Sequence, residues 1–214
     1  MKKIIMTVIL LQTLMLAAKE DVIQCANLIF GGVHTSRCFS AEFLSDVQKK
    51  TSIPTARRFT SVKLASDELF KYPFVVITGE DDFMFTKQER ENLRKYLESG
   101  GFMLASAGCS NKKFATAFKR EISHIFKDTK LKPLPMDHVL FRTLNKIDKL
   151  ELSHSSSEKP SLEGMEINGR IVLIFSLHGL NDTAHTQGCC CCGGNEIVNS
   201  IDVNVNILVY ALLH

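Results

Sequence analysis

Hydrophobic positions along this chain fall into short continuous runs that are separated by stretches with helical spacing. Within each run consecutive residues are apolar, without the alternation of a strand that has one solvated face. Continuous runs of this length are typical of strands that helices cover on both faces. We therefore predict buried strands at residues 26–32, 74–79, 102–105 and 171–176.

Segments with apolar residues at every third or fourth position follow these runs. The clearest opens with Thr86 and Glu89 in a capping box and ends at Gly100-Gly101. Strands that alternate with helices predict an α/β domain in three layers, built on a doubly wound and mostly parallel sheet. The predicted helices are residues 41–50, 86–99, 112–125 and 197–213. An edge strand at 61–64, a helical turn at 65–72 and a polar surface excursion at 145–164 complete the pattern.

The first residues have the order of a secretory signal peptide. Lys2-Lys3 precedes a mostly apolar run at 4–17, and Ala17-Ala18 supplies small residues at its end. The run is shorter than the about 20 residues that span a bilayer, which favours a cleaved signal. We predict a signal at 1–18 and a single α/β domain at 22–214, exported to the periplasm or beyond. The alternative is an uncleaved N-terminal helix that anchors the chain in the membrane.

The composition and charge of the chain bear on its possible partners. The hydrophobic fraction of 45% and the charged fraction of 23% are those of an ordinary globular domain. The formal net charge is only +3, and acidic residues are interspersed among the basic ones. Nucleic acid is therefore not an expected partner, because its binding needs a concentrated basic surface.

Candidate chemistry collects in the loops that leave the predicted strands. In an open parallel sheet, ligands bind outside the carboxyl ends of the strands, so these loops share one edge. An acidic trio there is suited to a divalent cation, although such a trio is more often a solvated loop. The edge residues are His34, Glu80, Asp81, Asp82, Cys109, His178 and Asp182.

Cys109 lies between a strand and a helix and follows small residues, which is the context of a nucleophile elbow. His178 would be its base and Asp182 its orienting carboxylate, as in a cysteine-dependent hydrolase or amidohydrolase. The second glycine of an elbow is missing, since Asn111 holds that place. The other interpretation is that Cys109 is a small packed residue of a strand–helix turn.

Four consecutive cysteines, residues 189–192, are the most unusual feature of the composition. Adjacent side chains of an extended chain point to opposite faces, so all four cannot bind one metal without a bend. Cys189 and Cys192 alone have the spacing of a zinc site, and His185 or His178 would complete it. A zinc site is thus one of three interpretations.

The other two interpretations need no metal. In an oxidising compartment the run can form disulfides with Cys25, Cys38 or Cys109, which leaves one odd thiol among seven cysteines. Alternatively it is a tight loop of small residues without a partner, and Gly193-Gly194 favours a sharp turn in every case. The spacing leaves the three alternatives open.

Six short motifs occur in order along most of the chain. They are Thr51-Ser52-Ile53, Leu69 to Gly79, Leu93 to Phe102, Phe118-Lys119-Arg120-Glu121, Leu134-Pro135 with Asp137-His138, and Asn204 to Leu212. In these motifs the chain resembles the bacterial family called domain of unknown function 4159. The resemblance implies a flavodoxin-like sheet, similar to class I glutamine amidotransferases, in proteins that are generally exported or membrane-associated.

The resemblance assigns no catalytic residue. Relatives usually carry Gly-His-Gly after the central strand, where this chain has Gly79-Glu80-Asp81. An amidotransferase also needs a His-x-Glu pair, and His178 is followed by Gly179-Leu180. We therefore expect a non-catalytic domain that binds a protein partner, a small ligand or a metal at the carboxyl edge, in the cell envelope. A hydrolase that uses Cys109 and His178 is the alternative.

Overall fold

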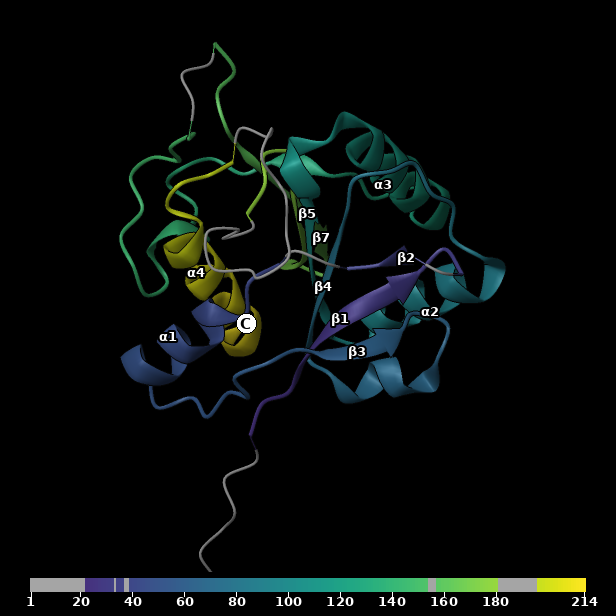
Figure 1. The fold of residues 1–214 in the computed structure, drawn as a ribbon, viewed down its shortest axis with the longest axis horizontal. Helices are drawn as coiled ribbons and strands as arrows, with labels where there is room; N and C mark the ends of the chain where they lie inside the picture. Colours follow the sequence, from purple (N-terminus) through teal and green to yellow (C-terminus); the bar gives the residue numbers. More distant parts are fainter. Residues whose placement is uncertain (1–21, 33, 37–38, 154–156, 181–195) are drawn as a thin grey trace, which may run out of the picture.

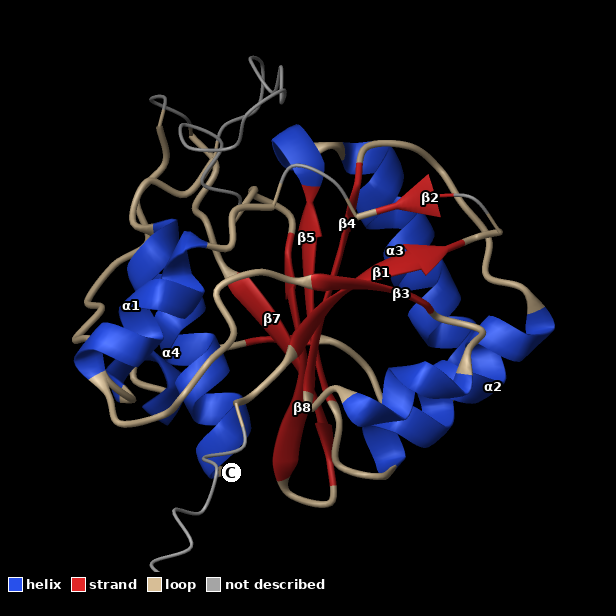
Figure 2. Ribbon diagram, turned by 60° about the horizontal axis from the view of Figure 1, so that its bottom comes forward, coloured by secondary structure: helices blue, strands red, loops and turns tan. Residues whose placement is uncertain are grey.

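A central sheet separates two helical layers (Figures 1 and 2). The computed structural model describes residues 22–32, 34–36, 39–153, 157–180 and 196–214. Within these residues the sheet has eight strands in the order β2-β1-β4-β5-β8-β7-β6, and β3 pairs with the other side of β1. The strands are β1 (Cys25–Phe30), β2 (His34–Thr35), β3 (Thr60–Lys63), β4 (Phe74–Gly79), β5 (Phe102–Ala107), β6 (Lys132–Pro133), β7 (Leu162–Ile167) and β8 (Arg170–Ser176).

The parallel strands confirm the predicted fold class. In chain order β1, β3, β4, β5 and β8 are numbers one to five, and their spatial order is 2-1-3-4-5, the flavodoxin-like order. Each continuous apolar run lies in one of them, since both faces of β4, β5 and β8 are covered. The helices are α1 (Glu42–Lys50), α2 (Lys87–Glu98), α3 (Lys112–Ile125) and α4 (Ser200–Leu213), with short 3-10 turns at η1 (Asp67–Lys71), η2 (Gly108–Ser110) and η3 (Val139–Arg142).

One region differs from the expected surface excursion at residues 145–164. Ile147 and Leu150 are buried in the core beside α4, and Leu152 forms an isolated bridge with Ile197. The segment then enters β7, which pairs antiparallel with β8 and with β6. The antiparallel edge was missed because β6 has only two residues, one of them proline, and β7 contains Glu163, Gly164 and Glu166.

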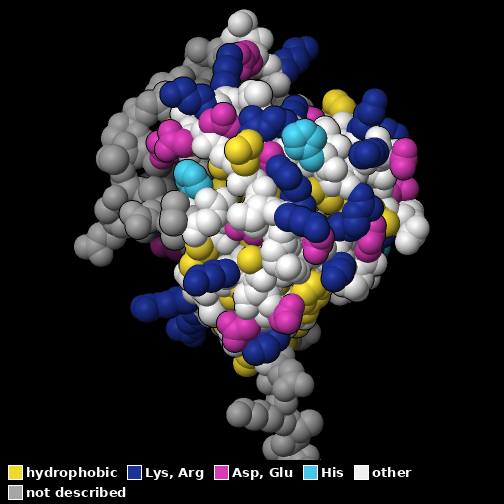
Figure 3. Space-filling view, turned by 90° about the vertical axis from the view of Figure 1, so that its right-hand side faces the viewer, with side chains coloured by type: hydrophobic (Ala, Val, Ile, Leu, Met, Phe, Trp, Pro, Cys, Tyr) yellow, Lys and Arg dark blue, Asp and Glu magenta, His cyan; other side chains and the backbone are white. Residues whose placement is uncertain are grey.

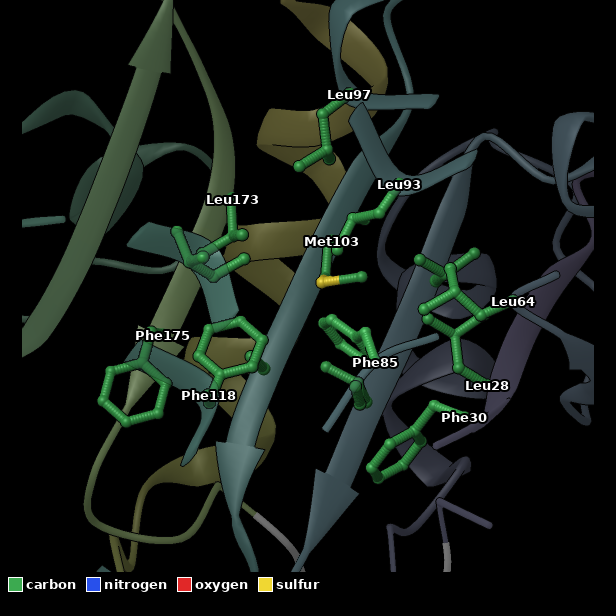
Figure 4. Close-up of a cluster of buried hydrophobic side chains, with 14 of the residues drawn as sticks. Leu28, Phe30, Leu64, Phe85, Leu93, Leu97, Met103, Phe118, Leu173 and Phe175 are labelled. Atoms are coloured by element: carbon green, nitrogen blue, oxygen red, sulfur yellow. The ribbon is translucent and has the colours of Figure 1, made fainter. Parts of the chain in front are cut away.

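Alternating residues of the central strands point to two separate cores. Helices α2 and α3 cover the face that carries Ile77, Met103 and Phe175, and Phe118 of α3 stacks on Phe175 with ring centroids 5.3 Å apart (Figure 4). Helices α1 and α4 cover the opposite face. A helix on each face explains why these strands show no polar alternation.

Strands β1 and β4 separate toward their carboxyl ends. They pair only as far as Asn27, after which the hairpin strand β2 lies against β1. Ser36, directly after β2, links the separated strands: its N–H donates to Leu28 O at 3.0 Å, and its hydroxyl accepts from Thr78 N at 3.1 Å and donates to Val76 O at 3.3 Å. Ser36 is buried, so one side chain replaces the missing rungs of the ladder.

We expect Ser36→Ala to lower the free energy of unfolding by about 1–3 kcal/mol, because Thr78 N–H and Val76 O lose their buried partner. Urea unfolding followed by circular dichroism measures this. Ser61→Ala, on exposed strand β3, is the matched control and should change stability by less than about 0.5 kcal/mol. Equal stability of the two variants would mean that the hydroxyl of Ser36 does not hold the strands.

Candidate functional site

The carboxyl edge of the sheet brings together most of the residues that the sequence places there. In a flavodoxin-like sheet the ligand crevice is expected between the first and third strands in chain order, here β1 and β4. That position is filled by β2 and Ser36, and the ring of His34 stacks on Phe30 with centroids 5.7 Å apart. The edge that remains for a ligand is formed by β4, β5 and β8.

The acidic trio after β4 is not arranged as a cation site. Glu80 Oε1 accepts from Cys109 Sγ at 3.6 Å, and Asp82 Oδ1 accepts from Arg120 Nη2 at 3.0 Å. Asp81 is exposed. Glu80 and Asp82 therefore engage different neighbours, and nowhere in the described residues do three His, Cys, Asp or Glu side chains gather closely enough to hold a metal.

Two adjacent residues of α3 fix the loop that carries this trio. The Glu121 carboxylate is fully buried and accepts from Phe85 N at 3.1 Å and from the guanidinium of Arg90 at 2.8 and 2.9 Å. Arg120 donates to Asp82 and to Phe83 O. The sequence did not single out Glu121 as more than part of a motif. The available signal was an acidic residue within the apolar stripe of a helix, which requires a buried partner.

Cys109 occupies a tight turn between β5 and α3. Its backbone is left-handed, with φ 49° and ψ 31°, and Ser110 follows with φ 53°. A Cβ at Gly108 would lie 3.1 Å from Gly79 O, closer than an ordinary contact, so a larger residue would require the neighbouring backbone to shift. Ser110 Oγ accepts from Gly179 N at 3.1 Å, which joins this turn to the end of β8. The left-handed backbone resembles a strained nucleophile turn.

His178 is buried and belongs to a different pair. Its Nε2 lies 3.2 Å from Glu158 Oε2, and Lys112 Nζ lies 3.5 Å from the other oxygen of that carboxylate. The hydrogen bond from His178 and the charge of Lys112 hold the pKa of Glu158 below its usual range. The described contacts of Cys109 and His178 are thus to two different carboxylates, Glu80 and Glu158. Sequence reasoning missed Glu158 because it lies in the segment taken for a surface excursion.

A row of hydroxyl groups crosses the carboxyl edge on the α1/α4 face. Thr78 and Ser106 are register partners in β4 and β5, and Ser106 and Ser176 are partners in β5 and β8. All three are fully buried. Together with two further buried residues they form what we call the edge polar cluster: Thr78, Ser106, Ser176, His178 and Asn204.

Four of the seven polar side-chain atoms in this cluster have partners, and one of the four is His178 Nε2, which contacts Glu158. Ser106 Oγ accepts from Leu180 N at 2.9 Å, Ser176 donates to the carbonyl of His178, and Asn204 Nδ2 donates to Leu180 O at 2.9 Å. The others lack partners among the described residues. They are Thr78 Oγ1, Asn204 Oδ1 and His178 Nδ1, each with almost no accessible surface. Buried polar groups of this kind are rare and require an explanation.

The remaining predicted site residues lie outside the described ranges. Asp182, His185 and the run at 189–192, including Cys189 and Cys192, belong to 181–195, so the zinc, disulfide and loop interpretations stay predictions. Within the described residues Cys25 is a buried free thiol. The signal at 1–18 also lies outside them, and among the helices that are described none is long and apolar enough to cross a membrane.

Comparison with protein families matches residues 31–212 to the family described as Domain of unknown function (DUF4159). The chain belongs to this family. The match covers β2 to α4, and so includes the edge polar cluster and the Arg120–Glu121 anchor of the DUF4159 domain. A comparison with curated proteins finds no match.

Glu121→Gln should lower the free energy of unfolding by about 2–3 kcal/mol, because a buried charged acceptor of Phe85 N–H and Arg90 is lost. Glu91→Gln is the matched control, since Glu91 lies on exposed α2 surface 3.9 Å from Lys87 and should contribute less than about 0.5 kcal/mol. Urea unfolding compares the two variants. If Glu121→Gln is as stable as the control, the carboxylate does not anchor the loop.

Proposed function

We propose that this DUF4159 domain is an exported binding protein that takes a small, hydroxyl-rich ligand at the edge polar cluster. The observation that carries the proposal is a set of three buried polar atoms near the carboxyl edge that have no partner among the described residues: Thr78 Oγ1, Asn204 Oδ1 and His178 Nδ1. Their side chains come from β4, α4 and the end of β8. A carboxyl edge is also where open α/β sheets bind ligands.

The chemistry of these atoms indicates the ligand class. An ionised carboxylate can only accept a hydrogen bond, so the contact between Glu158 Oε2 and His178 Nε2 places a proton on Nε2. In the tautomer that carries its proton on Nε2, Nδ1 is an acceptor. Asn204 Nδ2 is already engaged, which leaves Oδ1 as a second acceptor. Two acceptors and the Thr78 hydroxyl fit a ligand rich in hydrogen-bond donors, such as a saccharide or another polyol.

Stability supports the same conclusion. A buried polar atom without a hydrogen bond costs about 1–3 kcal/mol, so a chain shaped only for stability would carry an apolar side chain at such a position. Strand β4 reads Val75, Val76, Ile77 before Thr78, and valine has nearly the shape of threonine. Ligand sites are where proteins keep locally unfavourable groups. The signal order at residues 1–18 supports a ligand or protein partner in the cell envelope.

Without ligand, Thr78→Val should raise the free energy of unfolding by about 1 kcal/mol, because a buried hydroxyl without a partner is removed. Ser106→Ala, the register neighbour with equal burial, should lower it by about 1–2 kcal/mol, because Leu180 N–H loses its acceptor. Urea unfolding of both variants shows whether each hydroxyl stabilises or destabilises the folded protein. Loss of stability in Thr78→Val would mean that the hydroxyl serves the fold, and the proposal would fail.

The ligand class is tested on the same proteins by thermal unfolding against glucose, N-acetylglucosamine, myo-inositol and glycerol. A binding polyol should raise the Tm of the wild type and raise that of Thr78→Val and Asn204→Leu less. Ser61→Ala is the control and should respond like the wild type. A ligand that shifts all four proteins equally does not bind at the edge polar cluster.

A cysteine-dependent hydrolase is the second candidate, and the left-handed backbone of Cys109 is the observation that favours it. The thiol donates to Glu80 only while it keeps its proton, whereas the nucleophile of such an enzyme is the thiolate. Catalysis therefore requires Cys109 to leave Glu80 and pair with His178, with Glu158 orienting the ring.

The pH dependence of iodoacetamide labelling at Cys109, followed by peptide mass spectrometry, tests this candidate. A thiolate–imidazolium pair should react below about pH 7 and lose that reactivity in His178→Asn. An ordinary thiol reacts only as the pH approaches about 8.5, in both proteins, and this outcome rejects the hydrolase. Cys25 is the internal control: burial raises the pKa of its thiol to about 12, so it stays unlabelled in the folded protein.

A further inference from the structure

A hollow of about 580 Å³ lies on the other side of the sheet edge, between the acidic loop after β4 and the first turns of α3. We call it the α3 hollow. None of the edge polar cluster lines it, so it is a separate feature from the proposed polyol site. Its lining residues are Asp82, Lys112, Lys113, Thr116 and Arg120.

Arg120 presents a fixed cation to this hollow. Its guanidinium donates to Asp82 Oδ1 at 3.0 Å, to Phe83 O, and to Glu121 Oε1 at 3.4 Å. Glu121 is itself buried and anchored to Arg90 and Phe85. About a third of the Arg120 side chain stays exposed, at 35%. A guanidinium held in place in this way loses little entropy when it binds an anion.

The two lysines complete a positive lining. Lys112 pairs with Glu158 at 3.5 Å, and most of its side chain is exposed. Lys113 is exposed, and within the described part of the chain its ammonium has no acidic partner. Three cations face one carboxylate, Asp82, which leaves the lining with a formal net charge of +2.

The residues around the α3 hollow add to its positive charge. Residues 112–132 contain seven Lys and Arg and only two acidic residues, Glu121 and Asp128, a net charge of +5 that exceeds the +3 of the whole chain. Glu121 is buried, so it contributes little to the surface. Lys and Arg side chains gather on the molecular face in Figure 3. Such an uneven charge distribution raises the local concentration of anions.

We propose that the α3 hollow binds a phosphate monoester, with Lys113, Lys112 and Arg120 as its cationic contacts. A monoester carries a charge of about −1.5 to −2 at pH 7, which matches the +2 lining better than a carboxylate does. Arg and Lys are the side chains that recognise phosphate oxygens, the first through its planar fork and the second as a point charge. The monoester is either a free small molecule or a lipid headgroup.

Isothermal titration calorimetry of the whole protein with glycerol 3-phosphate and with inorganic phosphate tests the proposal. We expect saturable binding that Lys113→Gln weakens about tenfold, the loss typical of one charge-assisted contact. Lys95→Gln is the matched control, because it removes the same charge from an exposed position of α2. Arg120→Ala is a second variant, and its circular dichroism spectrum checks that it folds.

Cosedimentation with vesicles distinguishes the two sources. If vesicles of phosphatidylcholine with phosphatidic acid bind in a Lys113-dependent manner while the free monoesters do not, the ligand is a lipid headgroup. Equal weakening in Lys95→Gln and Lys113→Gln would show that overall charge alone attracts the anion and would overturn the site. Absence of saturable binding to any of these probes would overturn it as well, and neither result bears on the polyol site.

Discussion

The separation of β1 and β4, bridged by the buried hydroxyl of Ser36, determines the shape of the carboxyl edge of the sheet. A doubly wound sheet opens its crevice at the strand pair where the chain reverses direction across the sheet. In this domain that opening is filled by the β2 hairpin, and Ser36 satisfies the exposed ladder groups Val76 O and Thr78 N–H. Among the described residues, Thr78 Oγ1 on β4, His178 Nδ1 after β8 and Asn204 Oδ1 on α4 are buried without a hydrogen-bond partner at the part of the edge that stays unfilled.

Helix α3 connects this edge to the core that lies between the sheet and helices α2 and α3. Its buried face packs Phe118 on β8, while Glu121 holds the loop after β4 and Arg120 is held in turn. The edge polar cluster and the α3 hollow therefore lie on opposite faces of the same sheet edge. Their chemistry differs accordingly: one is buried and built from neutral hydroxyl, amide and imidazole groups, and the other is open and cationic.

Sequence patterns predict the parts of this structure that depend on local periodicity. Continuous apolar runs located β1, β4, β5 and β8, and the capping box of Thr86 and Glu89 located the start of α2. Contacts between distant residues had no such signal. Ser36 meets Thr78, Glu121 meets Phe85 and His178 meets Glu158 only because the topology brings their loops together. The edge of the sheet was thus predictable, whereas the pairing of its side chains was not.

In the edge polar cluster, side chains that the fold requires lie beside side chains for which the fold gives no reason. The acidic trio and Cys109 offer no such comparison. Thr78 and Ser106 are neighbours in register, equally buried and both hydroxyl-bearing, yet only Ser106 has a backbone partner. Asn204 likewise uses the nitrogen of its amide for Leu180, while its oxygen has no partner among the described residues. Folding accounts for the four partnered atoms of the cluster and gives no reason for the other three, whose burial carries an energetic cost. A ligand that supplies hydrogen-bond donors to these atoms would remove that cost.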